Sequence, residues 1–199
     1  MRGAVIAGGT ASRFGGRPKG LERVGGERIL DRVVQVLQSA AGQPPLLVAN
    51  APDAARWRPD LTVQKDLIPN CGSLGGIYSA LASGEGPVLV LAWDMPFVPV
   101  ELLEALVKGS NGSDVFLPES KSRRGVEPLC GVYGPACVAA MRTQLESEDF
   151  QATGFHDQVK LGRLSTDELT RFGDPDLLFF NVNTADDLAK AEELWRQRG

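Results

Sequence analysis

A short segment near the N-terminus has the composition of a phosphate-binding loop. Its four glycines and three basic residues are Gly8, Gly9, Gly15, Gly16, Arg13, Arg17 and Lys19. Glycines allow neighbouring backbone N–H groups to point into one concavity, and basic side chains add fixed positive charge to it. Pro18 stands beside Lys19 where a Walker A loop requires glycine, and no GxGxxG dinucleotide fingerprint is present. On residue types alone, an ordinary glycine-rich connector with solvated basic residues is the alternative.

A second candidate is Asp94, which closely follows the apolar run Val88–Ala92. A continuous apolar run is typical of a strand that is covered on both faces, and a carboxylate just beyond it would face the ligand crevice. Carboxylate oxygens suit Mg²⁺ that is shared with substrate phosphates. A turn-forming aspartate before Pro96 is the alternative. The glycine-rich loop and Asp94 together indicate a site for a nucleotide and a metal ion.

The elements that must position these residues alternate between strands and helices. Apolar runs predict strands at 4–7, 46–49, 62–64, 88–92, 114–117, 129–133 and 177–182. Helical spacing of apolar residues predicts helices at 29–40, 73–83, 100–108, 135–145 and 184–198. This alternation predicts a three-layer α/β fold with a mostly parallel central sheet, whose ligands bind beyond the carboxyl ends of the strands. The polar stretch 119–127 is expected to be a loop, and residues 146–164 show no clear period.

Composition narrows the classes of protein that fit. The 199 residues suit one domain over 1–199, and 43% apolar residues disfavour disorder. A net charge of −4 argues against a general nucleic-acid binder, and no apolar run is long enough to cross a membrane. Three cysteines without framework spacing indicate reduced thiols and a cytoplasmic location. The only histidine, His156, makes histidine-based catalysis or a histidine-rich metal site a poor hypothesis.

With these residues in place, the sequence resembles the molybdenum cofactor guanylyltransferase family, within the nucleotidyltransferases with a Rossmann-like sheet. The similarity lies in the glycine-rich segment that ends at Lys19, in Asp94-Met95-Pro96 and in Asn181-Val182-Asn183-Thr184. A shorter stretch, Gly72–Gly76 after Asp66, is similar as well. The blocks occur in the family's order over nearly the whole chain. One departure is Trp93, which stands where the family usually has a small residue.

The resemblance implies transfer of GMP from GTP to molybdopterin that carries molybdenum, with release of pyrophosphate. Arg13 and Lys19 would neutralise the triphosphate and the leaving pyrophosphate. Asp94 would hold Mg²⁺, the expected cofactor, and orient the α-phosphorus. The implied substrates are GTP and the molybdopterin cofactor, and cofactor chaperones or acceptor molybdoenzymes are candidate partners. Nucleic acids and membranes are not expected as partners.

The resemblance also assigns residues to the nucleotide and the acceptor. The implied nucleotide contacts are Ile6, Ala7, Gly8, Gly9, Lys19, Asn50, Asp66 and Asp94. A carboxylate or amide oxygen accepts hydrogen bonds from guanine N1–H and the exocyclic amine, which adenine lacks. For Asn50 and Asp66 a structural role in a turn is nearly as well supported. Asn181 and Asn183, two apart on an expected strand end, would face the same way toward the acceptor; a turn into the helix capped by Thr184 is the alternative.

Two other functions remain open at this stage. One is a nucleotidyltransferase of the same fold with a different substrate pair, such as cytidylyl transfer or transfer to a sugar or alcohol phosphate. Gly8-Gly9 favours GTP only through the resemblance, because related cytidylyl enzymes resemble Ala-Gly there. The other is a non-catalytic GTP-binding module that hands over the cofactor. A metal-independent dehydrogenase is disfavoured because GxGxxG is missing.

Overall fold

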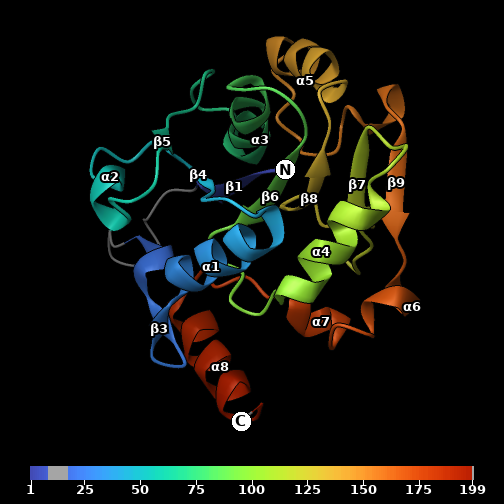
Figure 1. Cartoon of the computed structure of the whole chain (residues 1–199). Helices are drawn as coiled ribbons and strands as arrows, with labels where there is room; N and C mark the ends of the chain where they lie inside the picture. The colour runs from blue at the N-terminus through green and yellow to red at the C-terminus, as the bar shows by residue number, and fades with distance from the viewer. Residues whose placement is uncertain (9–17, 199) are drawn as a thin grey trace.

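A computed structural model describes residues 1–8 and 18–198 as a central sheet between two layers of helices (Figure 1). The strands are β1 (Arg2–Ala7), β2 (Arg23–Val24), β3 (Glu27–Arg28), β4 (Leu46–Ala49), β5 (Val63–Gln64), β6 (Val88–Ala92), β7 (Val115–Pro118), β8 (Cys130–Tyr133) and β9 (Leu161–Leu164). The helices are α1 (Ile29–Ala41), α2 (Ala54–Trp57), α3 (Gly72–Ala82), α4 (Val100–Gly109), α5 (Cys137–Glu146), α6 (Thr166–Leu169), α7 (Pro175–Leu178) and α8 (Ala185–Arg196). Single 3₁₀ turns occur at η2 (Lys19–Leu21) and η3 (His156–Gln158).

The main sheet has seven strands in the order β5-β4-β1-β6-β8-β7-β9. β1 lies between β4 and β6 and is parallel to both, while β8 is antiparallel to its neighbours β6 and β7. The prediction of a mostly parallel sheet is therefore confirmed, with β8 as the one reversed strand among the described residues. Because β1, β4 and β6 run the same way, their carboxyl ends share one edge of the sheet.

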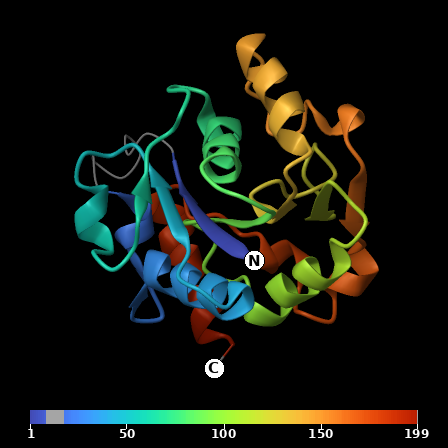
Figure 2. The same cartoon turned by 45° about the horizontal axis from the view of Figure 1, so that its top comes forward.

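Helices cover both faces of the sheet, as the turned view shows (Figure 2), and each face has its own hydrophobic core. Val5, Leu47 and Leu91 belong to the cluster that packs against α1 and α4, whereas Ile6 and Val90 belong to the cluster under α3 and α5. Alternate residues of β1 thus enter opposite cores, which explains why the strand is apolar throughout. The three-layer prediction is confirmed.

The predicted strand over 177–182 is wrong. Asp174 accepts a hydrogen bond from the backbone N–H of Asp176, and Pro175 occupies the first helical position, so the segment starts with the short helix α7. The sheet position beside β7 is taken by β9, in the stretch without a clear period. Leu178 is buried in the α1 and α4 core, so the apolar character of this segment reflects packing under helices rather than strand pairing.

Other sequence-based predictions hold with small shifts in their ends. Helix α8 begins after Thr184, whose side chain accepts from the backbone N–H of Asp187 while the Asp187 carboxylate accepts from the backbone of Thr184. Residues 119–127 form a loop closed by a single bridge between Glu119 and Val126. Within the described part of the chain, no helix combines the length and the apolar character that a membrane crossing requires.

Candidate functional site

Asp94 lies two residues beyond the end of β6, at the edge where the parallel strands end. Its backbone carbonyl accepts a hydrogen bond from the N–H of Val182 at 2.9 Å, and the preceding Trp93 N–H donates to the carbonyl of Ile6. These bonds tie the end of the central strand to β1 and to the segment before α8. Asp94 is buried, with 6% of its surface exposed.

The Lys19 ammonium group lies between two oxygens that come from distant parts of the chain. It forms an ion pair with Asp94 Oδ2 and donates to Asn183 Oδ1 at 2.6 Å. All three side chains are at least partly buried, which makes the ion pair stronger than a solvent-exposed one. Lys19 and Asp94 are thus brought together, as the sequence predicted, while their role in binding a nucleotide and a metal ion stays a prediction. Gly9 and Arg13, assigned to the same site, lie outside the described residues.

The second carboxylate oxygen of Asp94 has no hydrogen-bond partner among the described residues, although it is buried. A buried carboxylate oxygen without a partner is costly unless a cation or donor satisfies it. The described residues contain no group of three or more His, Cys, Asp or Glu side chains able to hold a metal ion. A divalent cation at Asp94 would therefore need further oxygen ligands from outside the carboxylate and histidine groups of this part of the chain.

Glu127 is a nearby carboxylate to which the sequence assigned no role. β6 and β8 pair Leu91 with Cys130, and Ala92 N–H donates to Leu129 O, so the segment that carries Glu127 leads into β8 beside the end of β6. Burial, and to a lesser extent the charge of Asp94, raise the pKa of the Glu127 carboxyl, while the Leu129 N–H and Arg124 oppose the shift. Glu127 comes near Asp94 because β8 runs antiparallel to β6. The apolar run of β8 does not reveal this direction, so the sequence alone could not identify Glu127.

A second polar pair follows β4 and β5 on the same edge of the sheet. Asn50 donates to Asp66 Oδ2 at 2.7 Å, and its Oδ1 accepts from the Asp66 backbone N–H at 2.9 Å. Burial raises the pKa of the Asp66 carboxyl, and the hydrogen bond from Asn50 partly offsets this. A side chain at Gly76 would contact both Ile6 and the Asp66 carboxylate. Asn50, Asp66 and the end of β1 are thus brought together, as the sequence predicted.

The end of β1 leaves room beside this pair. Ile6 and Ala7 are buried in the sheet, whereas Gly8 is exposed, and among the residues that the structure describes a Cβ at Gly8 would meet nothing within 4 Å. A ligand can therefore approach the backbone at Gly8 closely, which is a common reason for glycine after a strand.

Asn181 and Asn183 do not share one environment. Asn181 donates to the Phe179 carbonyl at 2.9 Å, whereas Asn183 holds Lys19 and donates its backbone N–H to Asp187 Oδ2. The argument that both side chains face the same way depended on a strand over 177–182, which the structure does not contain. That part of the prediction is wrong, and a role of either amide in acceptor binding stays a prediction.

Trp93, the departure from the family pattern, is accommodated by its surroundings. Its ring stacks on Trp57 with centroids 5.1 Å apart and planes inclined by 20°. Gly20 lies against the other side, so close that any side chain there would clash with the indole ring. The large residue before Asp94 is therefore packed between α2 and η2, next to Lys19.

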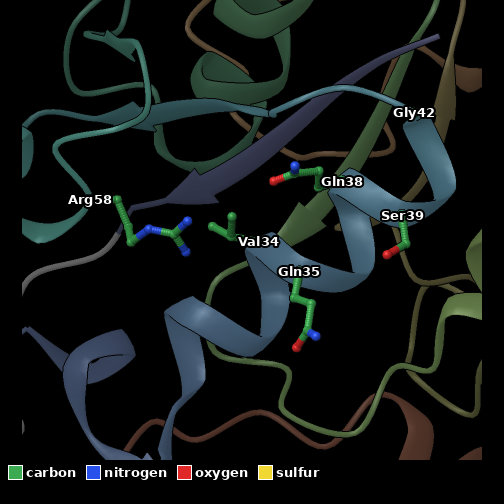
Figure 3. Close-up of a pocket in the computed structure, with 6 residues that line it drawn as sticks. All are labelled: Val34, Gln35, Gln38, Ser39, Gly42 and Arg58. Atoms are coloured by element: carbon green, nitrogen blue, oxygen red, sulfur yellow. The ribbon is translucent and has the colours of Figure 1, made fainter.

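A surface depression described by the structure lies elsewhere. Figure 3 shows it along α1, where Val34 and Gln38 extend toward Arg58 while Gln35 and Ser39 point away from it. None of the site residues discussed above lines it. Its lining comes mainly from one helix and lacks a concentration of charge, so it is not the candidate site.

A lysine held by oxygens beyond the carboxyl end of β6, and a carboxylate–amide pair beyond β4 and β5 on the same edge, are the arrangement expected of a ligand site in an α/β protein. A family model described as "MobA-like NTP transferase domain" matches residues 3–159, and the chain therefore belongs to this family. It is an enzyme of the nucleotidyltransferase class.

Similar proteins support the same assignment over the whole chain. The "Molybdenum cofactor guanylyltransferase" of Desulfosudis oleivorans is 34% identical over 96% of this chain and 94% of its own length. The "Probable molybdenum cofactor guanylyltransferase" of Pelotomaculum thermopropionicum is 33% identical over 95% and 90%. Among solved structures, "Molybdopterin-guanine dinucleotide biosynthesis protein A" of Archaeoglobus fulgidus superposes with a TM-score of 0.83, at 26% identity, over 99% of this chain and all of its own.

Proposed function

We propose that this nucleotidyltransferase transfers GMP from GTP to the molybdopterin-bound molybdenum cofactor and releases pyrophosphate. The observation that carries the proposal is the Lys19 ammonium group held by Asp94 and Asn183 at the carboxyl end of the central strand. The names of the similar proteins, which are guanylyltransferases of the molybdenum cofactor, support the choice of nucleotide and acceptor.

The reaction needs positioning and charge rather than a nucleophilic side chain. An oxygen of the acceptor's terminal phosphate forms a bond to the α-phosphorus of GTP as the bond to the bridging oxygen of pyrophosphate breaks. Lys19 would neutralise the negative charge that accumulates on the phosphate oxygens. Arg13, from the preceding loop, would contribute a second positive charge to the same end. His156, the only histidine of the sequence, is buried, and the proposed reaction needs no histidine base.

Mg²⁺ fits Asp94 because one of its carboxylate oxygens is buried without a described partner. Such an ion would neutralise and orient phosphate oxygens. Since no larger carboxylate or histidine cluster accompanies Asp94 in the described residues, phosphate and water oxygens would complete the shell, as is usual for Mg²⁺.

The base and the acceptor would lie on the two sides of this centre. Asp66, oriented by Asn50, would accept from guanine N1–H and its amine, and the backbone of Ile6, Ala7, Gly8 and Gly9 would line the same end. Asn183 Oδ1 accepts from Lys19, which leaves the amide N–H groups of Asn183 free to bind the acceptor; a contact of Asn181 with the acceptor stays part of the proposal. We place the reaction in the cytoplasm, with chaperones or molybdoenzymes as recipients of the product.

A direct test compares GTP, CTP and ATP in a pyrophosphate-release assay with Mg²⁺ and the molybdopterin acceptor. We expect release with GTP at least tenfold faster than with the other two nucleotides. Equal turnover with CTP would contradict the guanylyl assignment and favour cytidylyl transfer. Binding of GTP without any pyrophosphate release in the presence of the acceptor would instead support a non-catalytic handover module.

A further inference from the structure

The Lys19 ammonium group has two different oxygen partners, and the difference matters once a metal ion enters. Asp94 Oδ2 is charged, whereas Asn183 Oδ1, at 2.6 Å, is neutral. An ammonium group carries three N–H donors, so both contacts can exist at once. The site can therefore hold the lysine by either partner alone.

Asn183 is fixed in place by a dense set of backbone hydrogen bonds. The Asp187 carboxylate accepts from the backbone N–H groups of Asn183 at 3.0 Å and Thr184 at 2.9 Å. The preceding residue, Val182, donates its N–H to the backbone carbonyl of Asp94. The backbone position of Asn183 relative to Asp94 is thus set by the start of α8 and does not depend on Lys19.

A divalent cation at Asp94 and the Lys19 ammonium group would compete for one carboxylate. Two positive charges a few ångströms apart in a partly buried site repel strongly. A metal ion that takes both carboxylate oxygens, or that binds the unpartnered Oδ1 next to the ammonium group, would weaken the hold of Asp94 Oδ2 on Lys19 and favour its displacement. Asn183 offers a neutral acceptor next to the vacated position, where the ammonium group can stay close to the phosphates.

We propose that Asn183 is a positioning residue that retains Lys19 when a divalent cation displaces it from Asp94. The lysine and the metal then act on the triphosphate together instead of excluding one another. This inference rests on the proposed function only in assuming a divalent cation at Asp94. Asn183 as a direct metal ligand and Asn183 as a purely structural residue are the competing roles.

The test measures binding of Mn²⁺ alone to the full-length protein, from the electron paramagnetic resonance signal of free Mn²⁺. Wild type, Asn183→Ala, Lys19→Met and the double variant form a cycle, and Asp94→Asn gives the baseline. We expect Lys19→Met to bind Mn²⁺ at least fivefold more tightly than wild type because the competing cation is gone. Asn183→Ala should bind at least threefold more weakly, because Lys19 keeps only Asp94 as its partner.

The double variant decides between the roles. If Asn183 acts through Lys19, the double variant binds Mn²⁺ as Lys19→Met does, within twofold. An equal loss of affinity from Asn183→Ala in both backgrounds would overturn the proposal in favour of a direct ligand or a structural role. No effect of Asn183→Ala in either background, or equal Mn²⁺ binding by wild type and Asp94→Asn, would also overturn it.

Two controls keep the result interpretable. Asn111→Ala removes an exposed amide after α4 whose contact is to the Lys108 carbonyl, and it should leave Mn²⁺ binding unchanged. Asn183→Ser serves as a second variant if Asn183→Ala unfolds, and the free energy of unfolding is measured for each. Because neither GTP nor the acceptor is present, failure of pyrophosphate release with an intact Mn²⁺ cycle would count against the proposed function alone.

Discussion

The two ends of the proposed nucleotide site are built from different chemistry. At the phosphate end, Lys19, Asp94 and Asn183 join segments that lie 75 and 164 residues apart and form a charged group in a partly buried place. At the base end, Asn50 and Asp66 are 16 residues apart, and a neutral amide orients a carboxyl group whose pKa is raised by burial.

Because of this difference, we expect the phosphate end to determine the rate of transfer and the base end to determine which nucleotide reacts. Fixed charge at the phosphate end stabilises negative charge that develops during transfer, so its loss should lower kcat for every nucleotide. A carboxylate held by an amide at the base end distinguishes hydrogen-bond donors, so its loss should change which nucleotide reacts. Variants at the two ends should therefore give different kinetic signatures.

The largest effect is expected for Asp94→Asn. The substitution keeps the size of the side chain and removes the charge that holds Lys19 and the proposed metal ion. We expect kcat to fall by about 10³-fold or more, with GTP binding reduced far less. Steady-state pyrophosphate release and equilibrium binding of GTP measure the two quantities.

The matched control is Asp186→Asn, which neutralises an exposed carboxylate in the first turn of α8. It should leave kcat within about twofold of wild type. If Asp94→Asn retained most of its activity, the phosphate end would not be the catalytic end, and the comparison would fail.

A smaller and more selective effect is expected for Asp66→Asn. The amide presents an N–H donor where the carboxylate accepts, so a guanine contact is lost and an unpaired donor remains. We expect kcat/KM for GTP to fall by roughly 10- to 100-fold and that for ATP to change much less. The measured quantity is the ratio of kcat/KM for GTP to that for ATP.

Asp60→Asn provides the control for this end. Asp60 is an exposed carboxylate paired with Arg58, away from the Asn50 and Asp66 pair. Its variant should keep the ratio of wild type. A uniform loss for both nucleotides in Asp66→Asn would show that Asp66 supports the fold of this edge rather than the choice of base.

The smallest expected effect concerns His156 and the free energy of unfolding, not catalysis. Burial lowers the pKa of His156 to about 4, with Arg163 as a lesser cause, and its Nε2 has no described hydrogen-bond partner. Because the folded pKa lies below the unfolded value of about 6.5, the neutral ring favours folding above that pH. This contribution is lost progressively as the pH falls from about 6.5 toward 4.

We therefore expect the free energy of unfolding of wild type to fall between pH 7 and pH 5 by roughly 1 kcal/mol more than that of His156→Phe. Urea unfolding of both proteins at the two pH values measures the difference. The comparison between variants is needed because the raised pKa values of Asp66 and Glu127 act in the opposite direction in both proteins. An identical pH dependence of the two proteins would contradict the assignment of this effect to His156.

Local patterns in the sequence determined much of the fold. The apolar runs at β1, β4, β6, β7 and β8 and the helical spacing at α1, α3, α4, α5 and α8 appear in the structure with small shifts. Each signal is carried by neighbouring residues: both faces of β6 are covered, and Thr184 with Asp187 forms the helix start that the spacing predicted. Lys19 and Asp94 were also paired correctly, because both follow strands whose carboxyl ends share one edge.

Tertiary structure decided what depends on contacts between distant segments. The segment 177–182 is apolar because it packs under helices, which a strand pattern cannot distinguish from sheet pairing. Strand order and helix docking decide three further features. Asn181 and Asn183 have separate partners, Glu127 comes near Asp94, and Trp93 packs on Trp57. The sequence could name the charged residues, but which oxygen holds the lysine depends on distances across the folded chain.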